Sequence, residues 1–227
     1  MMEILVDTVN LDQIRRYNET LPLNGVTSNP TIVKKEGKID FFEHLREIRK
    51  VIGKNKALHV QVVGSTVDEI VADAHRITTE IDQDVYIKIP TDEKGLAAIK
   101  VLKSEGLHIT ATAIYTVFQG ELALAANADY LAPYYNRMQN MNIAADQVIA
   151  ELAQAIKASK SQTKILAASF HNVEQVTAAI KNGAHAVTIG TDVIQSGLNV
   201  PLISAAVADF KKDWESLYGS TTIADLR

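Results

Sequence analysis

Val85-Tyr86-Ile87-Lys88-Ile89-Pro90 is a short run of aliphatic and aromatic residues that holds one charged side chain, Lys88. β-Branched and aromatic residues are typical of strands. A nearly continuous apolar run indicates a strand of a parallel sheet, which is covered on both faces. The stretch therefore predicts an α/β fold in which the Lys88 side chain is buried.

Seven similar runs accompany this strand, and segments with helical spacing separate them. Eight β/α alternations predict a single (β/α)₈ TIM barrel, since eight is the number of parallel strands that closes such a sheet. An open doubly wound sheet is the alternative, but no G-x-G-x-x-G follows the first strand. The other predicted strands are Ile4–Thr8, Gly25–Asn29, Leu58–Val63, His108–Ile114, Tyr130–Tyr135, Ile165–Phe170 and Ala186–Gly190.

Local start and stop signals agree with this alternation. Apolar spacing predicts helices over Phe41–Ile52 and Ala144–Ile156. Capping boxes are expected at Thr66-x-x-Glu69 and Asp40-x-x-Glu43, an N-cap at Asn172, and helix stops at Gly106 and Gly183.

A further helix is expected over Pro201–Gly219, after the eighth unit. We assign residues 1–200 to the barrel and residues 201–227 to a C-terminal helix and tail of the same domain. Aromatic residues such as Phe210 and Trp214 alternate with charged ones in this helix. It either packs on its own subunit or is exchanged with a neighbouring subunit, and the pattern leaves both open.

Composition excludes several classes of function. The 227 residues are 47% hydrophobic, with a net charge of −4 and a pI near 5.9, which disfavours nucleic acid or an anionic membrane as a partner. The absence of cysteine excludes disulfides and thiol catalysis. No uninterrupted apolar run approaches the roughly 20 residues of a membrane helix, and the N-terminus lacks signal-peptide features. We expect a cytoplasmic protein.

Polar side chains recur at the carboxyl ends of the predicted strands, where barrel enzymes place their active sites. They are Asp7, Asn29, Gln61, Lys88, Thr112, Tyr134 with Arg137, and Ser169. The six histidines show no metal-binding spacing, and no nucleotide motif is present, so neither a metal nor an organic cofactor is expected.

Lys88 is the strongest candidate among them. Desolvation lowers the pKa of a buried ammonium, which leaves neutral amine to attack a carbonyl. The alternative is a structural lysine that reaches solvent or pairs with a carboxylate.

The other strand ends support this chemistry. Asp7 either orients substrate hydroxyls and assists proton transfer or merely caps the next helix. Tyr134 can exchange a proton, whereas Gln61 can only position a water or a hydroxyl. Arg137 and Ser169 suit a phosphate. For Tyr134 and Arg137, packing in the barrel mouth and exposure to solvent are the respective alternatives.

Taken together, these segments resemble the transaldolase family, and specifically its fructose-6-phosphate aldolase branch. The resemblance runs in order along almost the whole chain, and the T-S-N-P and K-I-P elements together are specific. The matching stretches are Val6-Asp7-Thr8, Gly25–Pro30, Val85–Pro90, Lys94–Ile99, Ala132–Arg137 and Ala167–Phe170.

The resemblance implies roles for particular residues. Lys88 would form the imine, Asp7 and Asn29 would hold substrate hydroxyls, and Gln61 and Thr112 would hold a catalytic water. Arg137 and Ser169 would bind the phosphate. We also group Thr27, Ala132 and His171 with the substrate-binding residues. His171 stands where relatives tend to carry Lys or Arg, which implies weaker or more pH-dependent phosphate binding.

The resemblance implies reversible cleavage of fructose 6-phosphate to dihydroxyacetone and glyceraldehyde 3-phosphate. Transaldolases of similar length carry Glu, Ser and Phe at the positions of Gln61, Ala132 and Tyr134, so all three match the aldolase branch. Transaldolase activity in the pentose phosphate pathway and a non-catalytic sugar-phosphate sensor remain alternatives. A homo-oligomer, a pentamer or a decamer of two stacked rings, is also implied.

Overall fold

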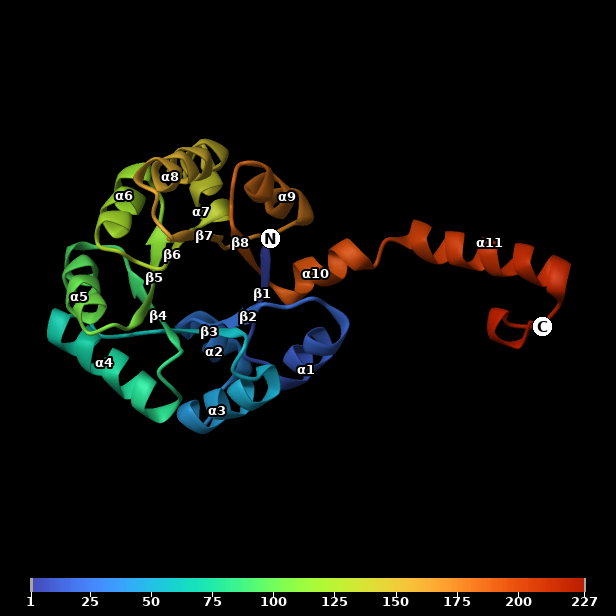
Figure 1. Cartoon of the computed structure of the whole chain (residues 1–227), viewed down its shortest axis with the longest axis horizontal. Helices are drawn as coiled ribbons and strands as arrows, with labels where there is room; N and C mark the ends of the chain where they lie inside the picture. The colour runs from blue at the N-terminus through green and yellow to red at the C-terminus, as the bar shows by residue number, and fades with distance from the viewer. Residues whose placement is uncertain (1, 227) are drawn as a thin grey trace.

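The computed structural model describes residues 2–226. Within them, eight parallel strands pair in chain order and close into a barrel, as predicted (Figure 1). β8 pairs with β1, so the sheet has no open edge and the doubly wound alternative is wrong. The strands are β1 (Glu3–Asp7), β2 (Gly25–Thr27), β3 (Ala57–Gln61), β4 (Tyr86–Pro90), β5 (His108–Ile114), β6 (Tyr130–Pro133), β7 (Lys164–Ala167) and β8 (Ala186–Ile189).

Several strands end before their predicted boundaries. β2 stops at Thr27, and β6 stops at Pro133. Two residues after β2, the Asn29 side chain accepts a hydrogen bond from the amide of Ile32 and caps α2 (Pro30–Glu36), so the chain turns from the strand into a helix at this point. The strand ends therefore turn into loops where the candidate site residues begin.

Helices surround the barrel (Figure 1) and begin at the caps that their sequences indicate. α3 (Phe41–Ile52) has its predicted bounds, and Thr66 and Glu69 form a reciprocal capping box at α4 (Val67–Glu80). Asp40 caps α3 through the amide of Glu43, but the expected capping box is only half formed, because the Glu43 carboxylate accepts from Arg46 instead of the Asp40 amide. The other barrel helices are α1 (Leu11–Thr20), α5 (Glu93–Ser104), α6 (Val117–Ala125), α7 (Tyr135–Asn140), α8 (Ala145–Ser159), α9 (Val173–Lys181) and α10 (Thr191–Leu198).

The remaining signals lie where they were expected, with one small shift. Asn172 accepts a hydrogen bond from the amide of Gln175 and caps α9. Gly106 and Gly183 follow α5 and α9 with φ of 87° and 102°, a conformation that glycine adopts at low cost. α8 runs from Ala145 to Ser159 and so ends three residues beyond its predicted end at Ile156, since Lys160 takes the left-handed cap.

Gly95 brings α5 close to the end of β4, the strand that carries Lys88. A Cβ atom at this position would lie 1.8 Å from the carbonyl oxygen of Pro90. Only glycine permits this approach without a backbone shift. The contact fixes the helix against the strand just beyond the candidate site.

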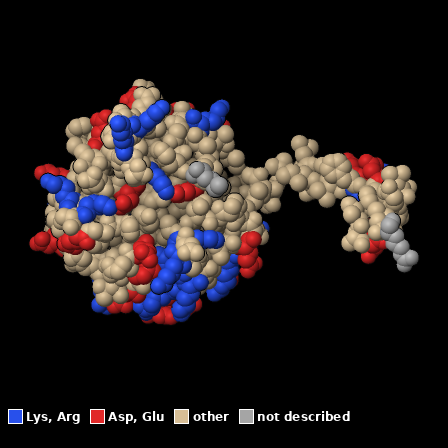
Figure 2. All heavy atoms as spheres, in the orientation of Figure 1, with Lys and Arg blue, Asp and Glu red and all other residues tan. Residues whose placement is uncertain are grey.

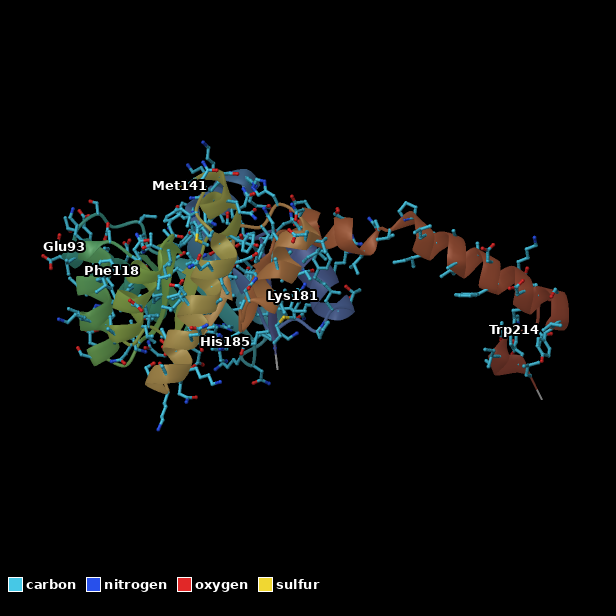
Figure 3. The ribbon with its side chains drawn as sticks, turned by 90° about the horizontal axis from the view of Figure 1, so that it is seen from above. Glu93, Phe118, Met141, Lys181, His185 and Trp214 are labelled. Atoms are coloured by element: carbon cyan, nitrogen blue, oxygen red, sulfur yellow. The ribbon has the colours of Figure 1, made fainter. Side chains whose placement is uncertain are left out.

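The C-terminal helix α11 (Pro201–Tyr218) extends away from the barrel as an arm (Figures 1 and 3), and a 3₁₀ turn (Ile223–Asp225) follows it. None of its residues is buried, so the alternative in which it packs on its own barrel is wrong. Trp214, at the far end of the arm, packs only locally, against the ring of Tyr218 at 4.5 Å. The apolar side chains left exposed on the arm include Leu202, Ile203, Val207, Phe210 and Leu217.

The same segment is apolar enough to qualify, by length and composition alone, as a membrane span. Thr191–Asp225 contains an 18-residue window with a mean hydropathy of 1.3, only 11% of it buried. The sequence contains no uninterrupted apolar run of membrane-span length, so no such segment was expected. The window still qualifies because an average over 18 residues tolerates isolated polar residues. Four of the five charges of α11 lie in its far half, after Phe210 (Figure 2), so the window extends back across Asn199 and Val200, where the helix is interrupted.

Candidate active site

Lys88 lies inside the barrel at the middle of β4, paired with Gln61 at the carboxyl end of β3, and its side chain is 5% exposed. Its ammonium donates a hydrogen bond to the carbonyl oxygen of Ser28 at 2.8 Å. Burial lowers the pKa of Lys88 below that of a free lysine, and the negative charge of Asp7 opposes this shift. The side chain faces a cavity of about 390 Å³, hereafter the catalytic cavity.

Asp7 ends β1 and lines the same cavity. The hydroxyl of Thr27 donates to its carboxylate at 2.5 Å and lies 2.6 Å from the hydroxyl of Thr188. Burial raises the pKa of Asp7, while the charge of Lys88 and the bond from Thr27 act in the opposite direction. The capping alternative for Asp7 is wrong, because Asn10 caps α1 instead.

Tyr134 lies between β6 and α7, with its phenol pointing to Thr112. The Thr112 hydroxyl donates to the phenol oxygen at 3.0 Å, and the Arg137 guanidinium lies 4.8 Å from the centre of the ring. Burial raises the pKa of Tyr134, so the phenol keeps its proton near neutral pH. The side chain can therefore supply a proton inside the cavity.

Gln61 and Asn29 complete the polar wall around Lys88. The Oε1 atom of Gln61 is buried and has no hydrogen-bond partner within residues 2–226, so it is available as an acceptor toward the cavity. The side-chain oxygen of Asn29 caps α2, which leaves its amide NH₂ as the available donor.

Arg137, Ser169 and His171 line the cavity on the side of β6 and β7. Ser169 has φ of 63°, in the left-handed region that non-glycine residues rarely adopt. Such strain is concentrated at functional sites, where the surrounding structure holds it. The Arg137 side chain also contacts the Tyr115 hydroxyl at 3.4 Å.

Three predicted residues lie behind the cavity wall and do not line it. Thr27 and Thr112 are fully buried and hold Asp7 and Tyr134 in place, and Ala132 is buried in β6. Sequence reasoning missed Thr188 and Lys35, which do line the cavity. Thr188 is the only hydroxyl in the apolar strand Ala186–Ile189, and this signal, the same kind that singled out Lys88, could have found it.

Among the histidines of the described residues, only His171 lines the catalytic cavity. His185, at the start of β8, lies at the end of the barrel opposite Glu93, Phe118 and Met141, which follow the carboxyl ends of strands (Figure 3). His59 is buried in the barrel interior, and desolvation lowers its pKa well below the usual value, so its ring is neutral. No group of three or more potential metal ligands occurs in the described part of the chain.

Comparison with known proteins shows the family of the chain. The family model for transaldolase/fructose-6-phosphate aldolase matches residues 4–221. The chain belongs to this family. Within the transaldolase/fructose-6-phosphate aldolase family, a Streptococcus pneumoniae (strain ATCC 700669 / Spain 23F-1) protein named probable fructose-6-phosphate aldolase is 54% identical over 222 residues. The alignment covers 98% of this chain and 100% of that relative.

A solved structure supports the fold independently. Thiamine phosphate pyrophosphorylase from Pyrococcus furiosus superposes with a TM-score of 0.57 over 84% of this chain and 86% of that one. At 14% identity, this likeness concerns the barrel alone.

Proposed function

We propose that the protein is a Schiff-base aldolase that reversibly cleaves fructose 6-phosphate to dihydroxyacetone and glyceraldehyde 3-phosphate. The observation that carries the proposal is the buried Lys88 amine, which shares one cavity with Asp7, Gln61, Tyr134 and Arg137. Membership of the family and the name of the Streptococcus relative support it.

The proposed reaction starts when the neutral amine of Lys88 attacks the C2 ketone. The resulting carbinolamine loses water to form an iminium. The C4 hydroxyl then loses its proton as the C3–C4 bond breaks, and the bonding electrons move into the iminium to give an enamine. Glyceraldehyde 3-phosphate leaves. Protonation of the enamine carbon and hydrolysis of the imine release dihydroxyacetone and restore the amine.

The other side chains take the remaining roles in this proposal. Tyr134, positioned by the Thr112 hydroxyl, moves protons through a water held by Gln61, and Asp7 and Asn29 hold substrate hydroxyls. Arg137 and Ser169 bind the phosphate beside His171. Every step uses side chains of this chain, so the proposal includes neither a metal nor an organic cofactor.

Borohydride trapping tests the covalent step. The protein is incubated with dihydroxyacetone and sodium borohydride, digested, and analysed by peptide mass spectrometry. We expect a reduced adduct on the peptide that contains Lys88. If the adduct is absent, or sits on another lysine, the mechanism is refuted.

Acceptor dependence separates cleavage from transfer. Glyceraldehyde 3-phosphate is measured from fructose 6-phosphate with and without erythrose 4-phosphate. An aldolase forms product without the acceptor, whereas product that forms only with the acceptor indicates a transaldolase. Ligand binding without turnover in either assay indicates a sensor.

The rate should rise with pH as Lys88 loses its proton. Because burial lowers the pKa of this amine, we expect kcat/KM for cleavage to rise with a midpoint below the ordinary lysine value of about 10.4. Asp7→Asn should move the midpoint lower still, because the charge of Asp7 raises the pKa of Lys88. A midpoint at or above about 10.4 contradicts a desolvated nucleophile.

We further propose that the chain forms a cytoplasmic homo-oligomer, a pentamer or a decamer, in which α11 is exchanged between subunits while residues 1–200 form the barrel of the same domain. Exposed apolar residues along α11 support this, because a monomer rarely leaves such a patch in water.

Deleting residues 201–227 should therefore reduce the particle mass measured by light scattering. Leu202→Asp on the full chain tests the same contact with less risk to folding, and Lys212→Asp, also on α11, is the control. An unchanged mass in both the deletion and Leu202→Asp contradicts the exchange.

A further inference from the structure

Lys35 is a cation near the end of α2 that the proposed chemistry has not used. Its side chain lines the catalytic cavity and also an adjoining cavity of about 620 Å³, hereafter the side cavity. Ser169 and His171 line both cavities as well. In the described residues, the Lys35 ammonium has neither an ion pair nor a hydrogen bond, although its neighbour Glu36 is held by the side chain of Asn10 at 3.0 Å.

The topology places Lys35 across the barrel from Arg137. α2 follows β2, and α7, which carries Arg137, follows β6. In a closed barrel of eight strands in chain order, β2 and β6 are four strands apart in either direction, so they face each other. The two cations thus lie on opposite sides of one cavity, with Ser169 at the boundary between this cavity and the next.

Charge complementarity points to an anion between them. The side chains with a formal charge at neutral pH along the catalytic cavity are Asp7, Lys35, Lys88 and Arg137. Three of these side chains are positive and one is negative, so the cavity is positively charged overall; Lys88 and Lys35 both lie close enough to Asp7 to lower the pKa of its carboxyl. A phosphate monoester carries a charge of about −1.5 to −2 at pH 7, and this matches two cations better than one.

We infer that Lys35 determines specificity for phosphorylated substrates, binding the phosphate from the side of the cavity opposite Arg137. The inference rests on the proposed aldol chemistry for its substrate, and it adds a residue from α2 to the phosphate site at Ser169. Lys35 binds the phosphate of the substrate and takes no part in imine formation.

Lys35→Met tests this role, and Lys34→Met is the matched control: it is exposed on the same helix and lines neither cavity. Kinetics are measured in the synthesis direction with dihydroxyacetone, using glyceraldehyde 3-phosphate or unphosphorylated glyceraldehyde as the acceptor. In Lys35→Met we expect KM for the phosphorylated acceptor to rise about tenfold, as for loss of one partly exposed charged contact. KM for glyceraldehyde and both kcat values should stay within about twofold, and Lys35→Arg should restore binding.

Other outcomes overturn the inference. An unchanged KM for glyceraldehyde 3-phosphate means that Lys35 does not contact the phosphate, and equal changes for both acceptors indicate a structural role. A loss of kcat with both acceptors indicates an effect on Asp7 or Lys88.

A second measurement keeps this test separate from the proposed function. If the wild-type protein makes no carbon–carbon bond, the proposed function fails, and binding of inorganic phosphate by calorimetry still tests Lys35. The inference predicts weaker phosphate binding in Lys35→Met than in Lys34→Met. Equal binding in the two variants contradicts it.

Discussion

Lys88→Met is expected to lower kcat for cleavage of fructose 6-phosphate by about 10⁴-fold or more. Covalent catalysis supplies much of an acceleration that is typically at least about 10⁶-fold, and methionine cannot form an imine. Methionine fills a similar volume in the buried site, so the barrel should still fold. Steady-state kinetics measure the loss, and circular dichroism verifies the fold.

Lys100→Met is the control for this variant, because Lys100 is exposed on α5 and lines no part of the catalytic cavity. It should keep full activity and the borohydride adduct. The proposal is wrong if Lys88→Met folds and retains more than about a tenth of wild-type kcat, since another nucleophile would then carry the reaction.

Tyr134→Phe is expected to lower kcat for cleavage by about 10²- to 10⁴-fold, the usual contribution of a proton donor in general acid–base catalysis. The ring should keep its contacts with Arg137 and Tyr115, so the substrate should still bind. Without the phenol, the enamine on Lys88 waits longer for a proton. We therefore expect the ratio of transfer to cleavage to rise when an acceptor aldehyde is added.

Tyr130→Phe is a control from the same strand. Tyr130 lies at the opposite end of β6, where its hydroxyl donates to Glu3 at 2.7 Å, so its loss should leave kcat nearly unchanged. Borohydride trapping should still label Lys88 in Tyr134→Phe. If Tyr134→Phe cleaves fructose 6-phosphate at the wild-type rate, the phenol is not the proton donor.

The strand that contains Lys88 shows what local sequence can predict. Burial of a single ammonium in an apolar strand costs free energy, so the sequence singled out Lys88 as a functional residue. The structure does bury Lys88. Alternation likewise located Asp7 and Gln61 on their strands. Asn29, Tyr134, Arg137 and Ser169 follow the carboxyl ends of strands, and that position, rather than alternation, located them.

Alternation does not show how deep a residue lies. Thr27 and Ala132 were expected to bind substrate, but they lie behind the wall, and Thr27 holds the carboxylate of Asp7. Depth depends on the register and tilt of neighbouring strands. These depend on pairing between residues that are far apart in the chain, such as Leu5 with Thr188.

Lys35 and α11 were beyond the reach of sequence reasoning for a related reason. A lysine near the end of a surface helix usually faces solvent, and only closure of the barrel brings Lys35 into the cavity that contains Arg137. The pattern of α11 contains apolar and charged residues but does not say what covers the apolar ones.

By itself, the sequence determined the number and order of the strands and helices and the identity of the buried amine, because burial of apolar residues and hydration of charged ones act locally and periodically. Only the tertiary structure decided which side chains meet around that amine. Distances across a barrel arise from strand pairing and closure, to which every strand contributes, so no single segment encodes them.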